Sequence, residues 1–193
     1  MEDPEFDLIR AIAHGDEAAF EQAVRRYQTS VTTFICRYIR DFYCAQDLAQ
    51  EVFLRIFQAA PKFTPKAKVS NWVFRIAYNL STNEMKHRKR IHGYHAEISA
   101  EGWGLRGRTS ASLTEAGTRE LGERLMAAMS QLPENQRAAL LLKINEGLTY
   151  LEISNVLDVS IASVESLIFR ARSRLKQLVR ASAGIPPESE ADS

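Results

Sequence analysis

The sequence has little of several things that other classes of protein need. It contains two cysteines, Cys36 and Cys44, so it is not a secreted scaffold held together by many disulfides. A membrane-spanning helix needs about 20 apolar residues, and no apolar run in this sequence approaches that length. The amino-terminal segment MEDPEFDL is acidic, whereas a secretory signal begins basic and then turns apolar. We therefore expect a protein that stays in the cytoplasm.

The chain also lacks a net charge and any pattern typical of strands. Its 25 Lys and Arg residues nearly balance 24 Asp and Glu residues, which leaves a net charge of +1. The charges are unevenly distributed, so the sum says less than the pattern. Apolar residues recur at three- and four-residue steps, and alternation of apolar and polar residues never extends beyond a few positions. This periodicity predicts an all-α fold.

Four helices are expected in the first half of the chain. A short helix over 6–14 ends at Gly15, and Asp16 is the predicted N-cap of a long helix. The apolar stripe of that long helix is Phe20, Val24, Tyr27, Val31, Phe34 and Tyr38. The segment 45–60 is expected to form the third helix, and Ser70 is the predicted cap of the fourth.

A glycine-rich stretch separates two blocks of different composition. Residues 93–117 hold five of the nine glycines, which predicts a flexible linker. Eight of the nine phenylalanines precede residue 75, whereas the later helices use Leu, Ile, Val and Ala. We therefore predict two small helical domains and a disordered tail. The expected boundaries are 1–95 for the first domain, 96–117 for the linker, 118–180 for the second domain and 181–193 for the tail.

The most specific pattern lies in the second block. Gly147 ends one helix, and Thr149 with Glu152 forms a T-x-x-E capping box that begins a short new helix. Asp158 tolerates the left-handed backbone of a tight turn, after which Ser160 or Ser163 can cap a longer helix. This is the outline of a helix-turn-helix. Its small core is expected to consist of Ile153, Leu157, Val159, Val164 and Ile168.

The longer helix carries side chains suited to DNA. Serine can pair with several bases, glutamate accepts from a cytosine amino group, and phenylalanine can contact a thymine methyl group. The residues of these types are Ser163, Glu165, Ser166 and Phe169. Arg170 and Arg172 begin a basic run that would attract phosphates. The alternative is an ordinary helical hairpin with a solvated basic face.

The fourth helix has an apolar root and a basic tip. Its inward side is expected to consist of Trp72, Val73, Ile76, Ala77 and Leu80. The opposite side carries amides, a hydroxyl and cations that can contact bases and phosphates: Asn71, Arg75, Asn79, Thr82, Lys86 and Lys89. The tip KHRKR, which includes Arg88, adds an attraction for phosphates that does not depend on sequence. The alternative is a core helix with a solvated charged end.

The outer face of the third helix has the opposite character. It combines acidic and amide side chains with one apolar residue: Asp47, Gln50, Glu51 and Leu54. Such a face would repel DNA and suit a basic groove on another protein. The alternative is a simple solvated face.

Four stretches together resemble the bacterial sigma factors of RNA polymerase. They are DLAQEVFLRIF, the F…W.FRIA.N pattern from Phe63 to Asn79, LPENQRAALLL, and LTYLEISNVLDVSIASVESLIFRARSRLKQL. They cover nearly the whole chain in the order found in that family. The length and the two helical domains with a loose linker resemble the extracytoplasmic-function group.

The resemblance implies a role for each surface of the first domain. The face around Asp47, Gln50, Glu51 and Leu54 would bind the beta-prime clamp helices of core polymerase. The loop 64–69, with Lys66 and Lys68, and the fourth helix would recognise and melt the minus-ten element of the promoter. Flipping unpaired bases into pockets is how proteins read a strand that has left the duplex. Asn79 matches an asparagine that contacts this element in the family.

The resemblance also implies roles for the rest of the chain. The helix-turn-helix would read the minus-thirty-five element with its second helix, and this domain would meet the beta flap of polymerase. Glu165 and Leu167 stand where many relatives carry basic residues, so the base preference does not transfer. The linker, with its apolar Trp103 and Leu105, would thread through polymerase. An anti-sigma factor, often membrane-linked in this group, is the implied regulatory partner.

Other functions are less compatible with the residues present. Cys36 and Cys44 have no evident His and acid partners, and His87, His92 and His95 fit no strong metal-ligand spacing. No glycine-rich phosphate loop occurs, so neither an enzyme nor a cofactor is expected. A stand-alone helix-turn-helix regulator is the main alternative, and a helical adaptor that never touches DNA is another.

Overall fold

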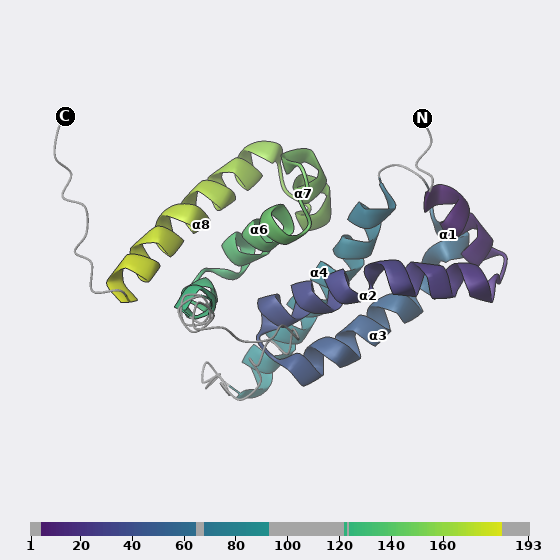
Figure 1. The fold of residues 1–193 in the computed structure, drawn as a ribbon, viewed down its shortest axis with the longest axis horizontal. Coiled ribbons are helices and arrows are strands. Elements are labelled where there is room, and N and C mark those ends of the chain that lie inside the picture. The colour runs from purple at the N-terminus through teal and green to yellow at the C-terminus, as the bar shows by residue number, and fades with distance from the viewer. Residues whose placement is uncertain (1–4, 65–67, 93–121, 123, 183–193) are drawn as a thin grey trace, which may run out of the picture.

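The computed structural model describes residues 5–64, 68–92, 122 and 124–182, and within these ranges it contains helices and no strands (Figure 1). The first block consists of α1 (Glu5–Ala13), α2 (Glu17–Ile39), α3 (Phe42–Ala59), the single 3-10 turn η1 (Ala60–Lys62) and α4 (Val69–His92). The second block consists of a helical segment at 124–130, α6 (Glu134–Asn145), α7 (Tyr150–Leu157) and α8 (Ile161–Ser182). The prediction of an all-α fold is confirmed.

Side-chain caps set the starts of α2 and α3. Gly15 has a φ of 85°, which ends α1, and the Asp16 carboxylate accepts from the Ala19 backbone N–H at 3.0 Å, as predicted. Helix α3 begins three residues earlier than expected, because Asp41 caps it by accepting from the Cys44 N–H at 3.0 Å. Asp41 thus orients the helix that carries the acidic outer face.

The start of α4 differs from the prediction that Ser70 caps it. The helix begins at Val69, and the Lys68 carbonyl accepts from the backbone N–H groups of Asn71 and Trp72 at 3.1 and 3.4 Å. Val69 is fully buried, so packing of this side chain, rather than capping by serine, determines where the helix begins. The prediction for Ser70 was therefore wrong.

The turn between α7 and α8 has the predicted geometry. Thr149 and Glu152 form the reciprocal capping box, and Asp158 adopts the left-handed conformation with a φ of 58°. The Ser160 hydroxyl accepts from the Ser163 N–H at 3.2 Å, so Ser160 is the cap of α8. The predicted core residues are buried except Val159, which is exposed because it directly follows the turn.

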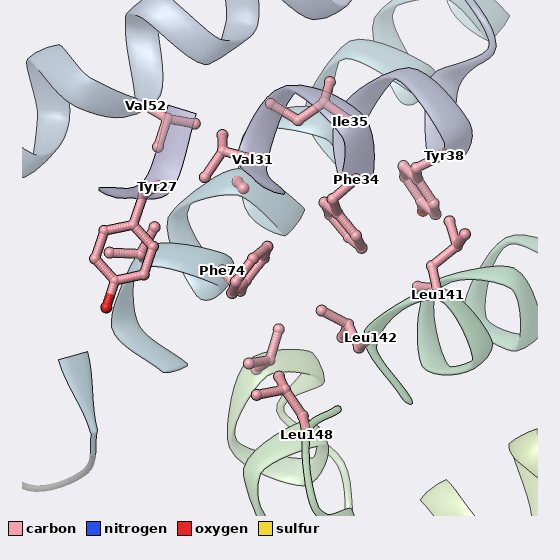
Figure 2. Packing of buried hydrophobic residues seen from close by; sticks show 14 of the residues in the cluster. Tyr27, Val31, Phe34, Ile35, Tyr38, Val52, Phe74, Leu141, Leu142 and Leu148 are labelled. Atoms are coloured by element: carbon pink, nitrogen blue, oxygen red, sulfur yellow. The ribbon is translucent and has the colours of Figure 1, made fainter. Parts of the chain in front are cut away.

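The two blocks pack against each other. Helix α4 contacts α7, and α2 contacts α6, so the buried apolar residues of both blocks form one contiguous cluster. In Figure 2, Leu141, Leu142 and Leu148 of the second block lie opposite the aromatic rings of Phe34 and Phe74. The sequence did not predict this contact. The predicted linker and most of the predicted tail, with Trp103 and Leu105, lie outside the described residues.

Candidate nucleic-acid and protein interfaces

The acidic outer face of α3 is open to solvent. Asp47, Gln50 and Leu54 are exposed, with 48% of the Leu54 surface accessible. Glu51 is half-buried and accepts from Arg55 at 2.8 Å one helical turn away. The structure therefore brings the four predicted residues together on one exposed face, which joins acidic charge to an apolar side chain.

Two aromatic residues extend this face and were missed by the sequence analysis. Tyr43 is 76% exposed, and Phe57 at the other end of α3 is also exposed. From Tyr43 through Asp47, Gln50 and Leu54 to Phe57, successive residues are four, three, four and three positions apart. This spacing places all five on one stripe of the helix. This regular spacing is the signal that could have identified them. The stripe is therefore apolar at both ends and in part of its middle.

The predicted polar face of α4 forms over most of its length. Arg75, Asn79, Lys86 and Lys89 are exposed, and they follow one another at helical spacing. Thr82 is half-buried, and its hydroxyl lies 3.4 Å from that of Tyr38. Lys68 is exposed immediately before the helix, whereas Lys66 lies outside the described residues.

Asn71 does not belong to the polar face of α4. It was predicted there, but only 5% of its surface is exposed, because the first turn of α4 is packed into the protein. Phe74 was not predicted to point inward, yet it is buried and meets Phe34 edge-to-face at 5.8 Å. A helical wheel assumes that α4 has one buried side. This helix packs against the second block as well as the first, so more of its circumference is buried than the wheel predicts.

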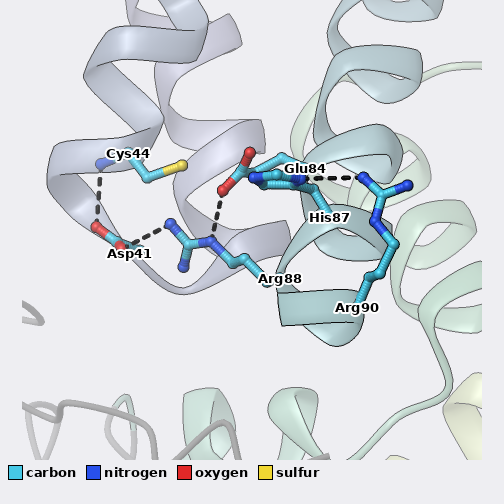
Figure 3. Close-up of polar contacts among 6 residues, drawn as sticks. All are labelled: Asp41, Cys44, Glu84, His87, Arg88 and Arg90. Carbon is cyan, nitrogen blue, oxygen red and sulfur yellow. Dashed lines mark hydrogen bonds and ion pairs between the residues drawn. The ribbon is translucent and has the colours of Figure 1, made fainter. Parts of the chain in front are cut away.

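Arg88 is directed toward α3 rather than along the polar face of α4 (Figure 3). Its guanidinium pairs with Glu84 at 2.7 Å and with Asp41 at 2.9 Å. Burial alone would lower the pKa of Arg88, but the two carboxylates raise it above its ordinary value. Arg88 therefore links the carboxyl-terminal part of α4 to the N-cap of α3, and a role in DNA binding stays a prediction.

Lys68, just before α4, and two other cations of the α4 face pair with carboxylates of the second block. Lys68 lies 2.9 Å from Glu152 in α7, Arg75 lies 3.5 Å from Asp158 at the end of α7, and Lys89 lies 2.6 Å from Glu134 at the start of α6. Although burial opposes it, the Thr149 backbone N–H and the Lys68 ammonium group hold the pKa of Glu152 below its ordinary value. The polar face of α4 is thus electrostatically complementary to the second block.

Two arginines form hydrogen bonds between the first and second blocks. Arg137 of α6 is 6% exposed; it donates to the Tyr38 carbonyl at 2.9 Å, and its guanidinium carbon lies 5.7 Å from the centre of the Tyr38 ring. Arg37 of α2 donates to the Asn145 side chain at 2.6 Å. These bonds connect helices that are about a hundred residues apart in the chain.

The outer face of α8 is exposed along its predicted recognition surface. Val164, Ile168 and Ala171 point into the core. The six predicted residues on the other side are all exposed: Ser163, Glu165, Ser166, Phe169, Arg170 and Arg172. Phe169 has 71% of its surface accessible. This face is available to a partner in the packed conformation.

The cysteines and histidines form no reactive centre in the described part of the chain. Cys36 and Cys44 are half-buried and free, and burial raises the pKa of both thiols, which disfavours the nucleophilic thiolate. The His87 ring nitrogen lies 3.1 Å from the Arg90 guanidinium (Figure 3). The described residues hold no cluster of three metal-binding side chains, and no helix among them is long and apolar enough to cross a membrane.

Comparisons with known proteins assign these two blocks to one family. Residues 23–91 match the model of sigma-70 region 2, and residues 122–175 match the model of sigma-70 region 4. The chain is 30% identical over 178 residues to the RNA polymerase sigma-H factor of Pseudomonas aeruginosa, with 90% of this chain and 92% of that protein covered. It is 27% identical to the ECF RNA polymerase sigma factor SigW of Bacillus subtilis, with 89% and 95% covered.

Solved structures share the fold. The structure of CnrH in complex with the cytosolic domain of CnrY matches with a TM-score of 0.69 at 24% identity, and 93% of this chain and 99% of that chain are covered. The sigma factor RpoE of Bartonella quintana, solved with the anti-sigma factor NepR, matches with a TM-score of 0.68 at 21% identity, with 83% and 96% covered. Because the models of both family regions match in order and the relatives align over nearly their full length, the chain belongs to the extracytoplasmic-function group of the sigma-70 family.

Proposed function

We propose that this chain directs core RNA polymerase to specific promoters in the cytoplasm and promotes promoter melting through three separate surfaces. The outer face of α3, with Asp47, Gln50, Glu51 and Leu54, docks on the beta-prime clamp helices. The polar face of α4 contacts the minus-ten element. The outer face of α8 reads the minus-thirty-five element, and the second block also meets the beta flap.

One observation carries this proposal: the acidic face of α3 and the exposed recognition helix belong to the same chain but face different partners. A face that joins Asp47 to Leu54 repels phosphate and complements a basic protein groove. A helix that exposes Phe169 beside two arginines suits the major groove. A protein with both surfaces can bring a second protein to DNA, which the stand-alone regulator would not need.

The chemistry of the α4 face suits an unpaired strand. Asn79 is exposed, and an amide both donates and accepts hydrogen bonds, so it can read a base edge that duplex DNA would hide. Lys86 and Lys89 on the same face supply charge for the phosphates. The chain performs no covalent chemistry in this scheme; it stabilises the melted strand by binding it.

We further propose that an anti-sigma factor controls this chain. The RpoE neighbour was solved with the anti-sigma factor NepR, and CnrH was solved with the cytosolic domain of CnrY. Leu54 and Phe169 are exposed apolar side chains on the polymerase and DNA faces, so a regulator that covered either one would block function.

The proposal is tested by adding the purified chain to sigma-free core polymerase and sequencing transcript starts on genomic DNA. We expect a limited set of starts that share sequence elements near minus ten and minus thirty-five. Core polymerase alone, and core with the Asp47→Lys, Glu51→Lys variant, provide the controls. A pattern of starts no different from that of core alone would overturn the proposal and favour the stand-alone regulator.

A further inference from the structure

Glu165 places a carboxylate on a surface that is otherwise suited to DNA. It lies in the second turn of α8, is exposed, and is followed by the exposed residues Phe169, Arg170 and Arg172. Phosphates repel a carboxylate, so this side chain lowers the affinity of α8 for DNA in general. Such a residue contributes to specificity when some sequences offset its cost and others do not.

The charge of Glu165 is not engaged within the described part of the chain. Three other carboxylates of the second block each pair with a cation of the first block: Glu134, Glu152 and Asp158. No residue that the structure describes forms an ion pair with Glu165, and its side chain is exposed. Its carboxylate is therefore accessible to a hydrogen-bond donor from outside the protein.

Glu165 shares one stripe of α8 with Phe169 and Arg172. These exposed residues are four and three positions apart, a spacing that places them on the same side of a helix. Ser166 and Arg170 lie on the neighbouring stripe, where the Arg170 guanidinium donates to the Ser166 carbonyl at 3.2 Å. From its amino-terminal end, the first stripe thus presents a hydrogen-bond acceptor, an apolar ring and a cation.

The place of Glu165 near the start of α8 determines which part of DNA it meets. In a helix-turn-helix, the amino-terminal residues of the second helix contact base edges in the major groove. Ser160 caps α8, and its hydroxyl lies 2.8 Å from that of Ser163, so both hydroxyls have a partner at the cap. Glu165 is the first polar residue after this cap, which places its carboxylate among the base edges.

The chemistry of the base edges favours cytosine opposite Glu165. An ionised carboxylate accepts hydrogen bonds and donates none. In the major groove, cytosine presents an amino donor without an acceptor, whereas adenine presents its amino donor beside the N7 acceptor. Guanine and thymine present acceptors. A carboxylate therefore binds cytosine best, binds adenine less well, and is repelled by guanine and thymine.

Phe169 defines a second position in the same DNA site. Four residues of an α-helix span about 6 Å along its axis, and successive nucleotides of one strand are about 3.4 Å apart. An exposed phenylalanine ring can contact the methyl group of thymine. A thymine that meets Phe169 therefore lies within about two base pairs of the base that meets Glu165.

We propose that Glu165 is a specificity-determining residue that selects a cytosine in the minus-thirty-five element, and that Phe169 selects a thymine within about two base pairs of it. This inference rests on the proposed role of α8 in reading that element. Glu165 acts in part by rejection, because its charge weakens binding to any sequence that places an acceptor opposite it.

The test uses polymerase assembled from core and the full chain, bound in competition to variants of one mapped promoter. Each base pair of the minus-thirty-five element is replaced in turn by the other three. For the wild-type chain we expect one position at which cytosine is preferred over guanine and thymine by at least about fivefold. Glu165→Ala should reduce this preference to less than about twofold.

The direction of the two affinity changes separates base selection from a structural role. Glu165→Ala should lower the affinity for the cytosine promoter and raise the affinity for the guanine and thymine promoters, because the repulsive charge is gone. A variant with a damaged fold would lose affinity for all of them. Glu21→Gln removes the same charge from an exposed site on α2 and should match wild type.

Glu165→Gln gives a sharper result, because it changes the preferred base. A glutamine amide both accepts and donates, so it can pair with the amino group and N7 of adenine at the same time. We expect the preference at that one position to move from cytosine to adenine. An unchanged base preference in Glu165→Ala and Glu165→Gln would overturn the proposal for Glu165.

The contact of Phe169 is tested by replacing each thymine of the element with deoxyuridine, which removes only the methyl group. One replacement, within about two base pairs of the selected cytosine, should lower the affinity of the wild-type chain by about threefold. The same replacement should have no effect on Phe169→Ala. An effect that persists in Phe169→Ala, or that occurs only at a more distant thymine, would overturn the proposal for Phe169.

Failure of the proposed function would give a different pattern. If α8 does not read the minus-thirty-five element, the wild-type chain will show no base preference at any of these positions, and this inference falls with that function. If only this inference fails, the wild-type chain will show base preferences that the Glu165 variants leave unaltered.

Discussion

The polar face of α4 and the outer face of α8 are both cationic helix surfaces, yet their surroundings differ. On α4, Arg75 and Lys89 face carboxylates of the second block. On α8, Arg170 and Arg172 are exposed, and Arg170 donates to the Ser166 carbonyl of its own helix at 3.2 Å. Similar charge patterns in the sequence thus lead to different surroundings: the α4 cations pair with carboxylates of another block, whereas Arg170 and Arg172 are exposed. Charge alone does not show which cations are available to DNA.

The difference fits the two forms of DNA that the faces are proposed to bind. A minus-thirty-five duplex is present before polymerase arrives, so an open α8 face can meet it at any time. A melted strand exists only within the polymerase complex, so α4 needs its cations only at that stage. The near-zero net charge follows from the same arrangement, since acidic and basic surfaces coexist in one chain.

The largest expected effect on promoter binding comes from removing the arginines of the outer face of α8. Arg170 and Arg172 are two positions apart and therefore point about 200° from each other around the helix. One is expected to read a base and the other to hold a phosphate. Loss of the base contact should cost on the order of 1–3 kcal/mol and relax one promoter position. Loss of the phosphate contact should weaken binding to all sequences and reduce the dependence on salt.

Single alanine substitutions and the double variant are compared on a minus-thirty-five duplex at several salt concentrations. Arg174→Ala, farther along α8, is the control for loss of one positive charge. If promoter use is unaltered when both Arg170 and Arg172 are alanine, the assignment of α8 to the minus-thirty-five element is wrong.

The outer face of α3 is acidic, in contrast to the cationic faces of α4 and α8. Asp47→Lys with Glu51→Lys should weaken binding to core polymerase by roughly tenfold or more, since like charges would then meet across the interface. Glu51 also pairs with Arg55, so retained helicity by circular dichroism is the necessary control. Unchanged core affinity with intact helicity would exclude this face as the docking site.

Within α4, amide and cation should have separable effects. Asn79→Ala should reduce promoter opening by on the order of 1 kcal/mol and leave core binding intact, since a base contact forms only after melting. Lys86→Gln should instead lower affinity for all strands and reduce the salt dependence. Fluorescence of 2-aminopurine in the minus-ten element reports opening. Normal opening by the Asn79 variant, with only the lysine variant impaired, would reduce α4 to an electrostatic anchor.

The smallest expected effect distinguishes Arg88, which pairs with Asp41, from Lys86, an exposed cation of the same helix. Asp41→Asn keeps an N-cap for α3 but removes the charge that faces Arg88. Although burial opposes it, the Cys44 N–H and Arg88 hold the pKa of Asp41 below its ordinary value. A carboxyl group with a lowered pKa stabilises the fold above its unfolded pKa of about 4, and this contribution is lost as pH falls through the folded value.

Thermal unfolding as a function of pH checks this assignment. The variant should be less stable than wild type at neutral pH by at most about 1 kcal/mol, and the gap should close below about pH 4. Lys86→Gln, which removes an exposed cation of the same helix, should leave the pH dependence in that range unchanged. A constant gap across all pH values would mean that the Arg88–Asp41 pair does not stabilise the fold.

Local sequence signals predicted the elements well, because caps and turns depend on neighbouring residues. Asp16, the Thr149–Glu152 capping box and Asp158 all have the expected geometry. Ser70 failed because the burial of Val69 sets the start of α4. Helical spacing also placed Asp47, Gln50 and Leu54 on one exposed face, and Arg170 and Arg172 on an exposed helix.

Long-range contacts were the part that periodicity could not supply. The burial of Phe74 and Asn71, the turn of Arg88 toward Asp41, and the pairing of Lys89 with Glu134 all depend on which element packs beside α4. A helical wheel holds no information about a neighbour that is more than forty residues away in the chain. The sequence therefore predicted the chemistry of the α4 face but not its partner within the protein.

Permanganate footprinting of the promoter tests the central claim most directly, because this reagent oxidises unpaired thymines. Duplex promoter is incubated with the chain alone, with core polymerase alone, and with both together. We expect reactive thymines in the minus-ten region only when chain and core are both present, and fewer of them with the Asn79→Ala variant. Tight binding of duplex by the chain alone, with no reactive thymines when core is added, would contradict it and identify a stand-alone regulator.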